Sequence, residues 1–317
     1  MNQSLSGAET ILRTCAGLSE EETLLIATDS SADSRAVELY SSSKKMNVDV
    51  TVGEIKGPVT REPPDDIAKQ MLENDVTIFC VNEPRTLLWG HADAKVAAIS
   101  RGKRILFLTQ PIESTPDPEQ LLRIRERSFK LADILESAKS VTLITRNSGN
   151  KTERLDLKLA KRKALRLSSI LSRPGSWGAV PDYAEAGVAP LETGTNGRLI
   201  IDGIIVGLGK VKSPVELEFQ DGRLVRIKGG KTGQDFDRLL GSDPSSRVLC
   251  ELGFGTNHLR TEVKGEFDDK KALGSVHIAL GDNHTFGGTN RSNIHVDALV
   301  VRPEVLIDGE PFDLMSV

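Results

Sequence analysis

The sequence predicts an α/β domain with a parallel sheet, followed by a β-rich α+β domain. In the first part of the chain, short apolar runs alternate with amphipathic segments, which is the strand, helix, strand order of a parallel sheet with crossover helices. After about Ser140, apolar and polar residues alternate along the runs, as in half-buried antiparallel strands. The chain of 317 residues is long enough for two domains. We therefore expect one domain over residues 1–138 and a second over 139–317.

The predicted first domain lacks the common nucleotide-binding motifs. Its strands are expected at residues 23–28, 48–53, 76–82 and 104–110, and its helices at 34–46 and 94–100. The first strand runs into DSSADSR, which has no glycine-rich turn, and the chain contains no GxxxxGK[ST] sequence. The parallel sheet is therefore predicted without a dinucleotide or P-loop site.

The predicted second domain is marked by turns between alternating runs. Its strands are expected at residues 140–146, 154–160, 197–203, 215–230 and 248–255, with a helix at 233–242. Asp-Gly pairs stand at Asp202-Gly203, Asp221-Gly222 and Asp308-Gly309. Asp-Gly suits the two-residue turns of β-hairpins, so each pair predicts a hairpin.

Charge and composition argue against nucleic-acid and membrane partners. The formal net charge is −4 with both signs interspersed, which provides no basic surface for nucleic acid. No apolar run approaches the roughly 20 residues that span a bilayer, and the start MNQSLSGAET lacks the regions of a signal peptide. We therefore expect a cytoplasmic protein. Cys15, Cys80 and Cys250 are far apart in sequence and are expected to be buried thiols.

Three of the five histidines, His277, His284 and His295, fall within residues 276–297. Residues two apart in a strand share a face, so NIHVDALV would present His295 and Asp297 side by side. A single histidine in a strand is often an ordinary core residue. The HxD spacing alone therefore leaves metal binding and simple packing open.

Glu251 is the second unusual feature, because it interrupts the apolar strand VLCELGFG. A buried carboxylate needs a cation or hydrogen-bond donors, and a metal ion would satisfy it. Imidazole and carboxylate together suit zinc, cobalt, manganese or ferrous iron. The cysteines are placed too far apart for a thiolate site.

Two long stretches resemble a known family. ELGFGTN, followed by GSVHIALGDNHTFGGTNRSNIHVDALVVRPEVLIDGE, resembles the C-terminal block of the aminopeptidase T and aminopeptidase S metallopeptidases. SWGAVPDYAEAGVAPLETGTNGRLIIDG is similar to an upstream block of that family. The resemblance extends from about Ser176 to the C-terminus.

This resemblance implies a metal-binding second domain and a metallo-aminopeptidase-like hydrolase. Two divalent ions, zinc, cobalt or manganese, would be held by Glu185, Glu251, His277, His295 and Asp297. Metal-activated water would attack an amide bond of a small peptide next to its free amino group, with Glu185 or Glu251 as general base. His284 stands where the family has a site tyrosine and is a further catalytic candidate. A homodimer is also implied.

Two other functions remain open. LLIATDSSADSR and REPPDDIAKQML look like the 2,5-dihydroxypyridine ring-cleaving dioxygenases, which share this fold and use one ferrous iron held by two histidines and a carboxylate. His295 and Asp297 fit that element, whereas Glu251 stands near a place where a histidine is expected. His284 in place of tyrosine would fit a third function, a non-catalytic protein that binds a metal or small ligand. The hydrolase is the preferred prediction.

Overall fold

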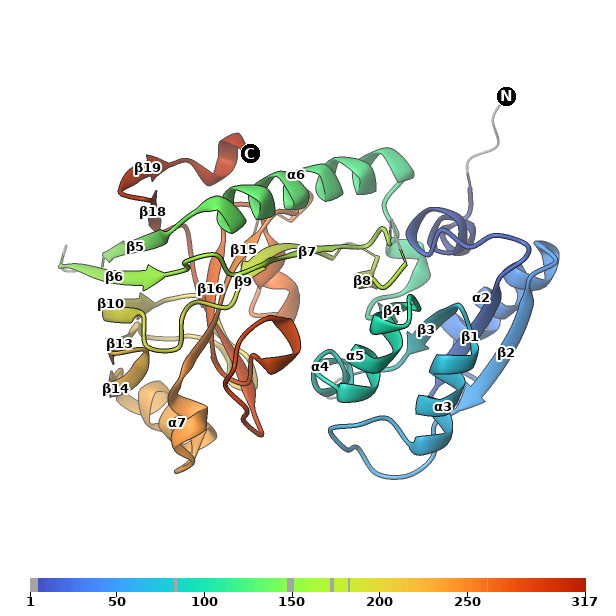
Figure 1. Ribbon diagram of the computed structural model, residues 1–317, viewed down its shortest axis with the longest axis horizontal. Helices are drawn as coiled ribbons and strands as arrows, with labels where there is room; N and C mark the ends of the chain where they lie inside the picture. The colour runs from blue at the N-terminus through green and yellow to red at the C-terminus, as the bar shows by residue number, and fades with distance from the viewer. Residues whose placement is uncertain (1–4, 83–84, 147–150, 172–173, 182, 261) are drawn as a thin grey trace. The chain divides into compact units, whose positions relative to one another are not determined.

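The chain crosses three times between two units in the computed structural model (Figure 1). The structure describes residues 5–82, 85–146, 151–171, 174–181, 183–260 and 262–317. Unit 1 comprises Met1–Arg125 and Leu167–Tyr183, and unit 2 comprises Glu126–Arg166 and Ala184–Val317. The predicted division at residues 138/139 differs from these units, because residues 167–183 return to unit 1 and contribute a strand to its sheet.

Unit 1 contains the predicted parallel sheet. Its strands are β1 (Thr23–Thr28), β2 (Asp49–Glu54), β3 (Val76–Cys80), β4 (Arg104–Leu108) and β8 (Trp177–Val180). The strands lie in the order β2-β1-β3-β4-β8, and all neighbours pair in parallel. The α/β class is therefore confirmed, and β8 is a strand that the sequence pattern did not reveal.

Helices cover both faces of this sheet. They are α1 (Gly7–Glu9), η1 (Thr10–Cys15), α2 (Ser34–Lys45), α3 (Asp65–Glu73), α4 (Arg85–Trp89), α5 (Asp93–Ser100) and η2 (Ile112–Ser114). Successive strand residues point to opposite faces, so Leu24 and Ile26 pack with Ile11 and Leu39 on one face. Leu25 joins Ile67 and Trp89 in a separate cluster on the other face. This two-sided burial explains why the strands read as continuous apolar runs.

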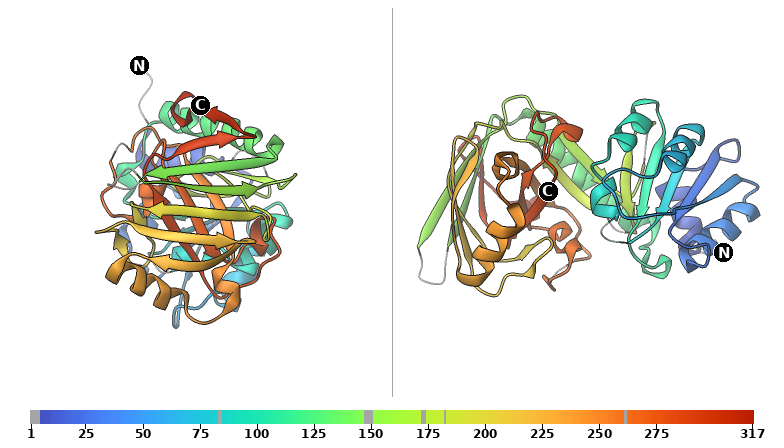
Figure 2. Two further views of the ribbon diagram at one scale, coloured as in Figure 1. Left: turned by 90° about the vertical axis from the view of Figure 1, so that its left-hand side faces the viewer. Right: turned by 90° about the horizontal axis from the view of Figure 1, so that it is seen from below.

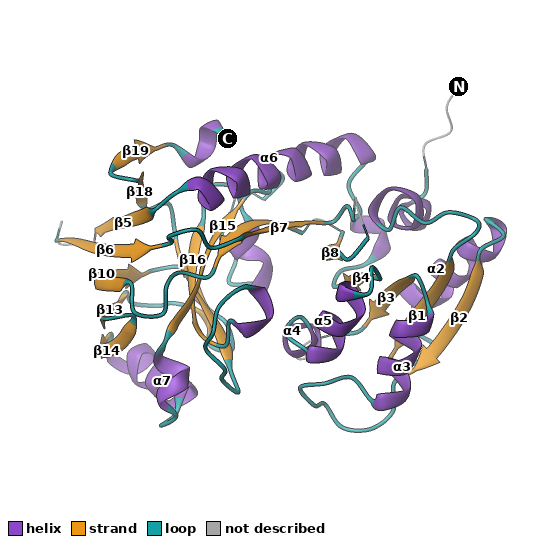
Figure 3. Ribbon diagram, in the orientation of Figure 1, coloured by secondary structure: helices purple, strands orange, loops and turns teal. Residues whose placement is uncertain are grey.

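Unit 2 contains two seven-stranded sheets among its described residues (Figure 3). The first is ordered β14-β13-β10-β6-β5-β18-β19, with β5 Ser140–Arg146, β6 Thr152–Lys158, β10 Thr195–Ile201, β13 Val215–Gln220, β14 Arg223–Lys228, β18 Glu304–Ile307 and β19 Glu310–Phe312. The second is ordered β12-β11-β17-β16-β15-β9-β7, with β7 Ala164–Ser168, β9 Ala184–Val188, β11 Ile204–Ile205, β12 Gly209–Lys210, β15 Leu249–Gly255, β16 Val276–Gly281 and β17 His295–Val300. The β-rich character of the second part is thus confirmed.

The two sheets of unit 2 lie against each other as layers (Figure 2). One hydrophobic core joins them. Leu155 and Leu217 of the first sheet belong to the same buried cluster as Phe254, Ile278 and Ala298 of the second. Helix α6 (Pro118–Ser137) begins in unit 1 and ends in unit 2, where its C-terminal half joins this cluster. Helix α7 (Gly230–Leu240) agrees with the predicted helix at 233–242. Short helical turns complete the unit: η3 Pro244–Arg247, η4 Phe267–Lys271, η5 His284–Phe286 and η6 Leu314–Ser316.

The three Asp-Gly turns do not all form hairpins. Asp221-Gly222 joins β13 to β14 and Asp308-Gly309 joins β18 to β19, in each case with both residues at positive φ. Asp202-Gly203 instead carries the chain from β10 in one sheet to β11 in the other. That hairpin prediction was wrong, because the apolar residues on either side of the turn join different sheets.

No helix within the described part of the chain has the length and apolarity needed to span a bilayer.

Candidate metal centre

The predicted ligands lie on one face of the second sheet of unit 2. Glu185 belongs to β9, Glu251 to β15, His277 to β16, and His295 and Asp297 to β17, four strands that are neighbours in that sheet. The residues that alternate with them, such as Ile278 and Val296, enter the core on the opposite face. Because successive strand residues point to opposite sides, one face of the sheet carries the potential ligands and the other carries apolar side chains.

Small residues stand opposite each of these side chains across the strand ladders. Gly253 pairs with His277, Gly255 with Glu185, and Gly281 with His295. Ala279 pairs with both Glu251 and Asp297. A Cβ on Gly253 would come within 2.3 Å of His277 Nε2, so the imidazole ring occupies the space that a side chain there would need. The small residues make room for bulky polar groups inside a sheet.

The five side chains form two groups that share one member. Glu185, Glu251 and His277 form one group, and Glu251, His295 and Asp297 form the other. In each group, one potential ligand atom per residue lies within 4.8 Å of the others. Glu251 belongs to both groups, so its carboxylate is placed to contact metal ions at either position.

Hydrogen bonds fix the orientation of the His295 ring. Its Nδ1 lies 2.8 Å from the carbonyl oxygen of Asp282 and donates to it. Nε2 then points to Glu251 Oε2 at 2.9 Å and Asp297 Oδ1 at 3.4 Å. Burial opposes protonation of this ring, but Cys250, Asp297 and Glu251 outweigh burial and raise the pKa of His295 well above its ordinary value. An imidazole held through Nδ1 in this way presents Nε2 as a ligand.

His277 lies in a different environment. It is completely buried, and neither ring nitrogen has a hydrogen-bond partner. Burial lowers its pKa to about 3, which keeps the ring neutral. Its Nε2 lies 3.5 Å from Glu185 Oε1. A neutral imidazole has one ring nitrogen with a free lone pair, and beside a carboxylate that nitrogen can bind a divalent cation.

Two lysines that the sequence analysis missed also reach the site. Both come from η4, where Lys270 Nζ lies 2.5 Å from Asp297 Oδ2 and Lys271 Nζ pairs with Glu185 Oε2. Burial lowers the pKa of Lys271 to about 7, with Asp297 acting against this shift. In the sequence, DDKK looks like an exposed charged turn. Only the fold brings Lys271 to a glutamate in a distant strand.

The donor set fits a divalent metal ion. Imidazole nitrogens and carboxylate oxygens are suitable ligands for zinc, manganese and ferrous iron. The buried atoms Asp297 Oδ1, His277 Nδ1 and His277 Nε2 have no hydrogen-bond partner in the described structure, which is costly unless a ligand meets them. The residues present are therefore able to hold a metal ion.

The structure does not bring His284 into either group. Its Nδ1 lies 2.5 Å from Asp282 Oδ1, and its backbone N–H donates to the same oxygen at 3.1 Å. The predicted catalytic role of His284 thus has no support from proximity to the ligands. It holds the Asp282 carboxylate, while the carbonyl of Asp282 accepts from His295.

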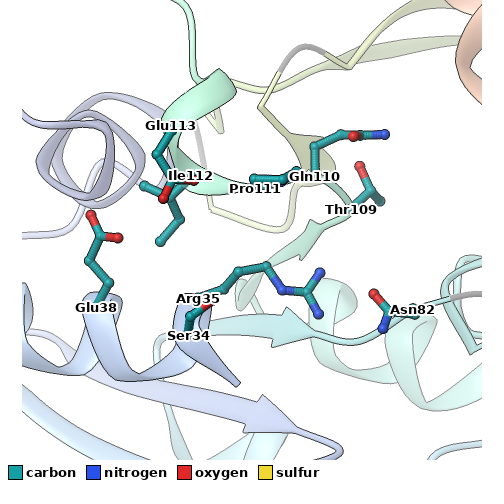
Figure 4. A pocket seen from close by; sticks show the side chains of 9 residues that line it. All are labelled: Ser34, Arg35, Glu38, Asn82, Thr109, Gln110, Pro111, Ile112 and Glu113. Carbon is teal, nitrogen blue, oxygen red and sulfur yellow. The ribbon is translucent and has the colours of Figure 1, made fainter. Parts of the chain in front are cut away.

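A cavity of about 310 Å³ lies in unit 1, and none of these ligands lines it (Figure 4). It is lined by residues that follow three of the parallel strands, including Arg35, Asn82 and Thr109. The Arg35 guanidinium lies 2.6 Å from Asp33 and donates to the Leu108 carbonyl. Its charge is thus already balanced by a neighbouring carboxylate.

Solved structures of other proteins share this fold. The structure of 2,5-dihydroxypyridine dioxygenase from Pseudomonas putida KT2440 matches with a TM-score of 0.76 and 17% sequence identity, covering 97% of this chain and 96% of that one. Wild-type AmpT from Thermus thermophilus matches with a TM-score of 0.62 and 14% identity, covering 96% of both chains. No curated protein matches the sequence.

A family model decides between the two resemblances seen in the sequence. The model described as NicX, 2,5-dihydroxypyridine 5,6-dioxygenase, matches residues 8–313. The aminopeptidase T resemblance is supported at the level of the fold, whereas the family match covers nearly the whole chain. The chain therefore belongs to the NicX, 2,5-dihydroxypyridine 5,6-dioxygenase, family.

Proposed function

We propose that the chain is a metal-dependent ring-cleaving dioxygenase that acts on a small hydroxylated aromatic ring of the dihydroxypyridine type. The observation that carries this proposal is the family match over residues 8–313, a range that includes every candidate ligand. The sequence motifs favoured an aminopeptidase-like hydrolase over this function. Because of the family match, we place the dioxygenase first and the hydrolase second.

We propose that Glu251, His295 and Asp297 hold the metal. These side chains converge, since His295 Nε2 lies 2.9 Å from Glu251 and 3.4 Å from Asp297. Ferrous iron with open coordination positions supplies the chemistry that lets dioxygen react with an aromatic ring. The protein's part is to hold the ligands rigidly. Lys270 fixes one oxygen of Asp297, and the Asp282 carbonyl fixes the His295 ring.

A two-metal hydrolase is the second candidate, and the composition of the groups favours it. Each group contains one histidine and two carboxylates, whereas the usual iron triad has two histidines and one carboxylate. The two groups also share Glu251, as a pair of metal ions bridged by a carboxylate would require. In this function Glu185 or Glu251 would be the general base.

Metal analysis combined with two activity assays would separate the candidates. The protein would be purified anaerobically without added metal and assayed for oxygen uptake with 2,5-dihydroxypyridine and for release of amino acids from short peptides. We expect close to one iron per chain and oxygen uptake that depends on the ring substrate. About two zinc, cobalt or manganese ions with peptide hydrolysis would establish the hydrolase instead. Bound metal with neither activity would favour a non-catalytic binding protein.

Asp297→Asn supplies the matched control for these assays. It keeps the shape of the side chain but removes the charge of a carboxylate that lies between His295 and Lys270. Oxygen uptake that survives in this variant would come from a contaminant or from a site elsewhere.

A homodimer is a further part of the proposal, carried over from the family resemblance. Light scattering of the purified protein would give the mass in solution. A mass near twice 34.4 kDa is expected.

A further inference from the structure

Two adjacent lysines enter the candidate metal centre from η4, where each one meets a different carboxylate. Lys271 pairs with Glu185, and the two side chains are 1% and 2% exposed. Lys270 pairs with Asp297, and these side chains are 8% and 4% exposed. Lysine is rarely buried this deeply without a partner. The two lysine–carboxylate pairs are therefore part of the structure of the site.

Two of the three carboxylates of the site are each paired with a lysine. Glu185, Glu251 and Asp297 are the carboxylates of the two groups. With one proton between them, Lys271 and Glu185 have no net charge, and the same holds for Lys270 and Asp297. Glu251 then remains, and His295 contacts it at 2.9 Å. Buried charge is costly unless it is compensated. With two ammonium groups against three carboxylates, one divalent cation leaves a small excess of positive charge, whereas two cations leave a large one.

The two lysines act on different groups. Glu185 belongs only to the group with His277, so Lys271 neutralises that group. Lys270 neutralises Asp297 in the other group, but Asp297 Oδ1 remains without a hydrogen-bond partner. The group of Glu251, His295 and Asp297 thus keeps a carboxylate oxygen without a hydrogen bond, 3.4 Å from His295 Nε2.

We propose that Lys271 takes the charge-compensating role of a second metal ion and so limits the site to one divalent cation. This inference rests on the proposed function, because it assumes that the site binds a metal. Lys271 would then determine how many metal ions the site binds. The number of metal ions in turn decides between single-metal and two-metal chemistry. Replacing the ammonium with an uncharged side chain of similar length should open the position formed by Glu185, Glu251 and His277.

The experiment counts manganese ions bound to the full-length chain. Wild type, Lys271→Met and Lys270→Met would be stripped with a chelator, loaded anaerobically with Mn²⁺ and analysed for metal content and by electron paramagnetic resonance. We expect one Mn²⁺ per chain in wild type with an isolated six-line signal. Lys271→Met should bind two, with the altered signal of a coupled pair. Lys270→Met should stay at one.

Several results would overturn the inference. Two Mn²⁺ in wild type would show that Lys271 does not limit the number, and one Mn²⁺ in Lys271→Met would show that charge at this position does not decide it. If wild type binds none but Lys271→Met binds Mn²⁺, Lys271 excludes metal altogether, and both the proposed function and the limit of one cation fail. If neither binds, both fail.

A second variant guards against misfolding. Lys271→Met leaves Glu185 buried without a cation, so its stability should depend on added Mn²⁺. The double variant Lys271→Met/Glu185→Gln removes both charges and should fold without metal and bind one Mn²⁺. Failure of Lys271→Met to fold even when Mn²⁺ is present during refolding would contradict the inference, because a second cation should replace the missing ammonium.

Discussion

Gly253 shows how a single small residue makes space for the candidate metal centre. Gly253→Ala would place a Cβ 2.2 Å from His277 Cε1 in a fully buried site, so we expect the free energy of unfolding to fall by about 1–3 kcal/mol. Gly233→Ala in α7 is the matched control, since its nearest contact is 3.3 Å and alanine favours helix. Urea unfolding would measure both variants. Equal stability of the two would mean that the His277 ring moves aside freely.

The two histidines of the site should differ in their effect on metal binding. His295→Gln removes the nitrogen that faces Glu251 and Asp297, and we expect it to abolish stoichiometric metal. His277→Gln should keep one metal ion per chain, since His277 belongs only to the group that contains Glu185. Metal analysis after dialysis would measure both. If His277→Gln loses its metal while His295→Gln keeps it, the ion belongs to the group of Glu185, Glu251 and His277.

Strand periodicity predicted some of the site's side chains but not all. The pairing of His295 with Asp297, and the place of Glu251 in an apolar strand, follow from alternation, because neighbouring strand residues point to opposite faces. Glu185 was assigned only by family resemblance. The lysines were missed because Lys271 and Glu185 are 86 residues apart, and nothing in either local sequence indicates the other. His284 was a catalytic candidate because it stands where the resembled family has a site tyrosine, and in the structure it lies in a short helical turn and contacts Asp282.

Among the secondary-structure elements, two hairpin turns with the same Asp-Gly sequence should respond differently to alanine. Gly222 and Gly309 both have positive φ, at 77° and 90°, so alanine is strained at either place. At Gly309 the new Cβ meets nothing within 4 Å, whereas at Gly222 it would lie 1.8 Å from the Glu192 carbonyl. We expect Gly309→Ala to cost about 1–2 kcal/mol and Gly222→Ala clearly more. Thermal unfolding of both would test the order, and a smaller loss at Gly222 would contradict it.

The sequence predicted strands correctly where both faces of the strand are buried. The hairpin prediction failed where the chain passes from one sheet to the other. The strands of the parallel sheet read as continuous apolar runs because both of their faces are covered. Strand β8 has only four residues, two of which are Gly178 and Ala179, and this gives too little apolar pattern to recognise. The Asp202-Gly203 turn has hairpin composition, but the partner sheets of β10 and β11 are set by contacts that no local sequence contains.

At the scale of the whole molecule, stability should fall in acid. The backbone N–H of Thr23 donates to Asp75 and, together with Lys103, lowers the pKa of that carboxyl. A group whose pKa is lower when folded contributes stability above its unfolded pKa, and that contribution is lost as pH falls through the folded pKa. We therefore expect the urea midpoint to drop below about pH 4.

Asp75→Asn tests the source of this dependence. The variant should be less stable than wild type at pH 7, and the difference should shrink as the pH approaches 3. Glu20→Gln, at an exposed position, is the control. A stability difference for Asp75→Asn that stays constant across this range would place the acid sensitivity in other carboxylates.

Strand β8 also affects the order in which a newly synthesised chain can fold. The ribosome releases β4 well before β8, and β5, β6 and β7 emerge between them. Until residues 177–180 emerge, a delay on the order of seconds, β4 is an open strand edge that can pair with other chains. The N-terminal unit therefore finishes its sheet only after strands of the other unit have appeared, and co-translational folding of the two units must overlap in time.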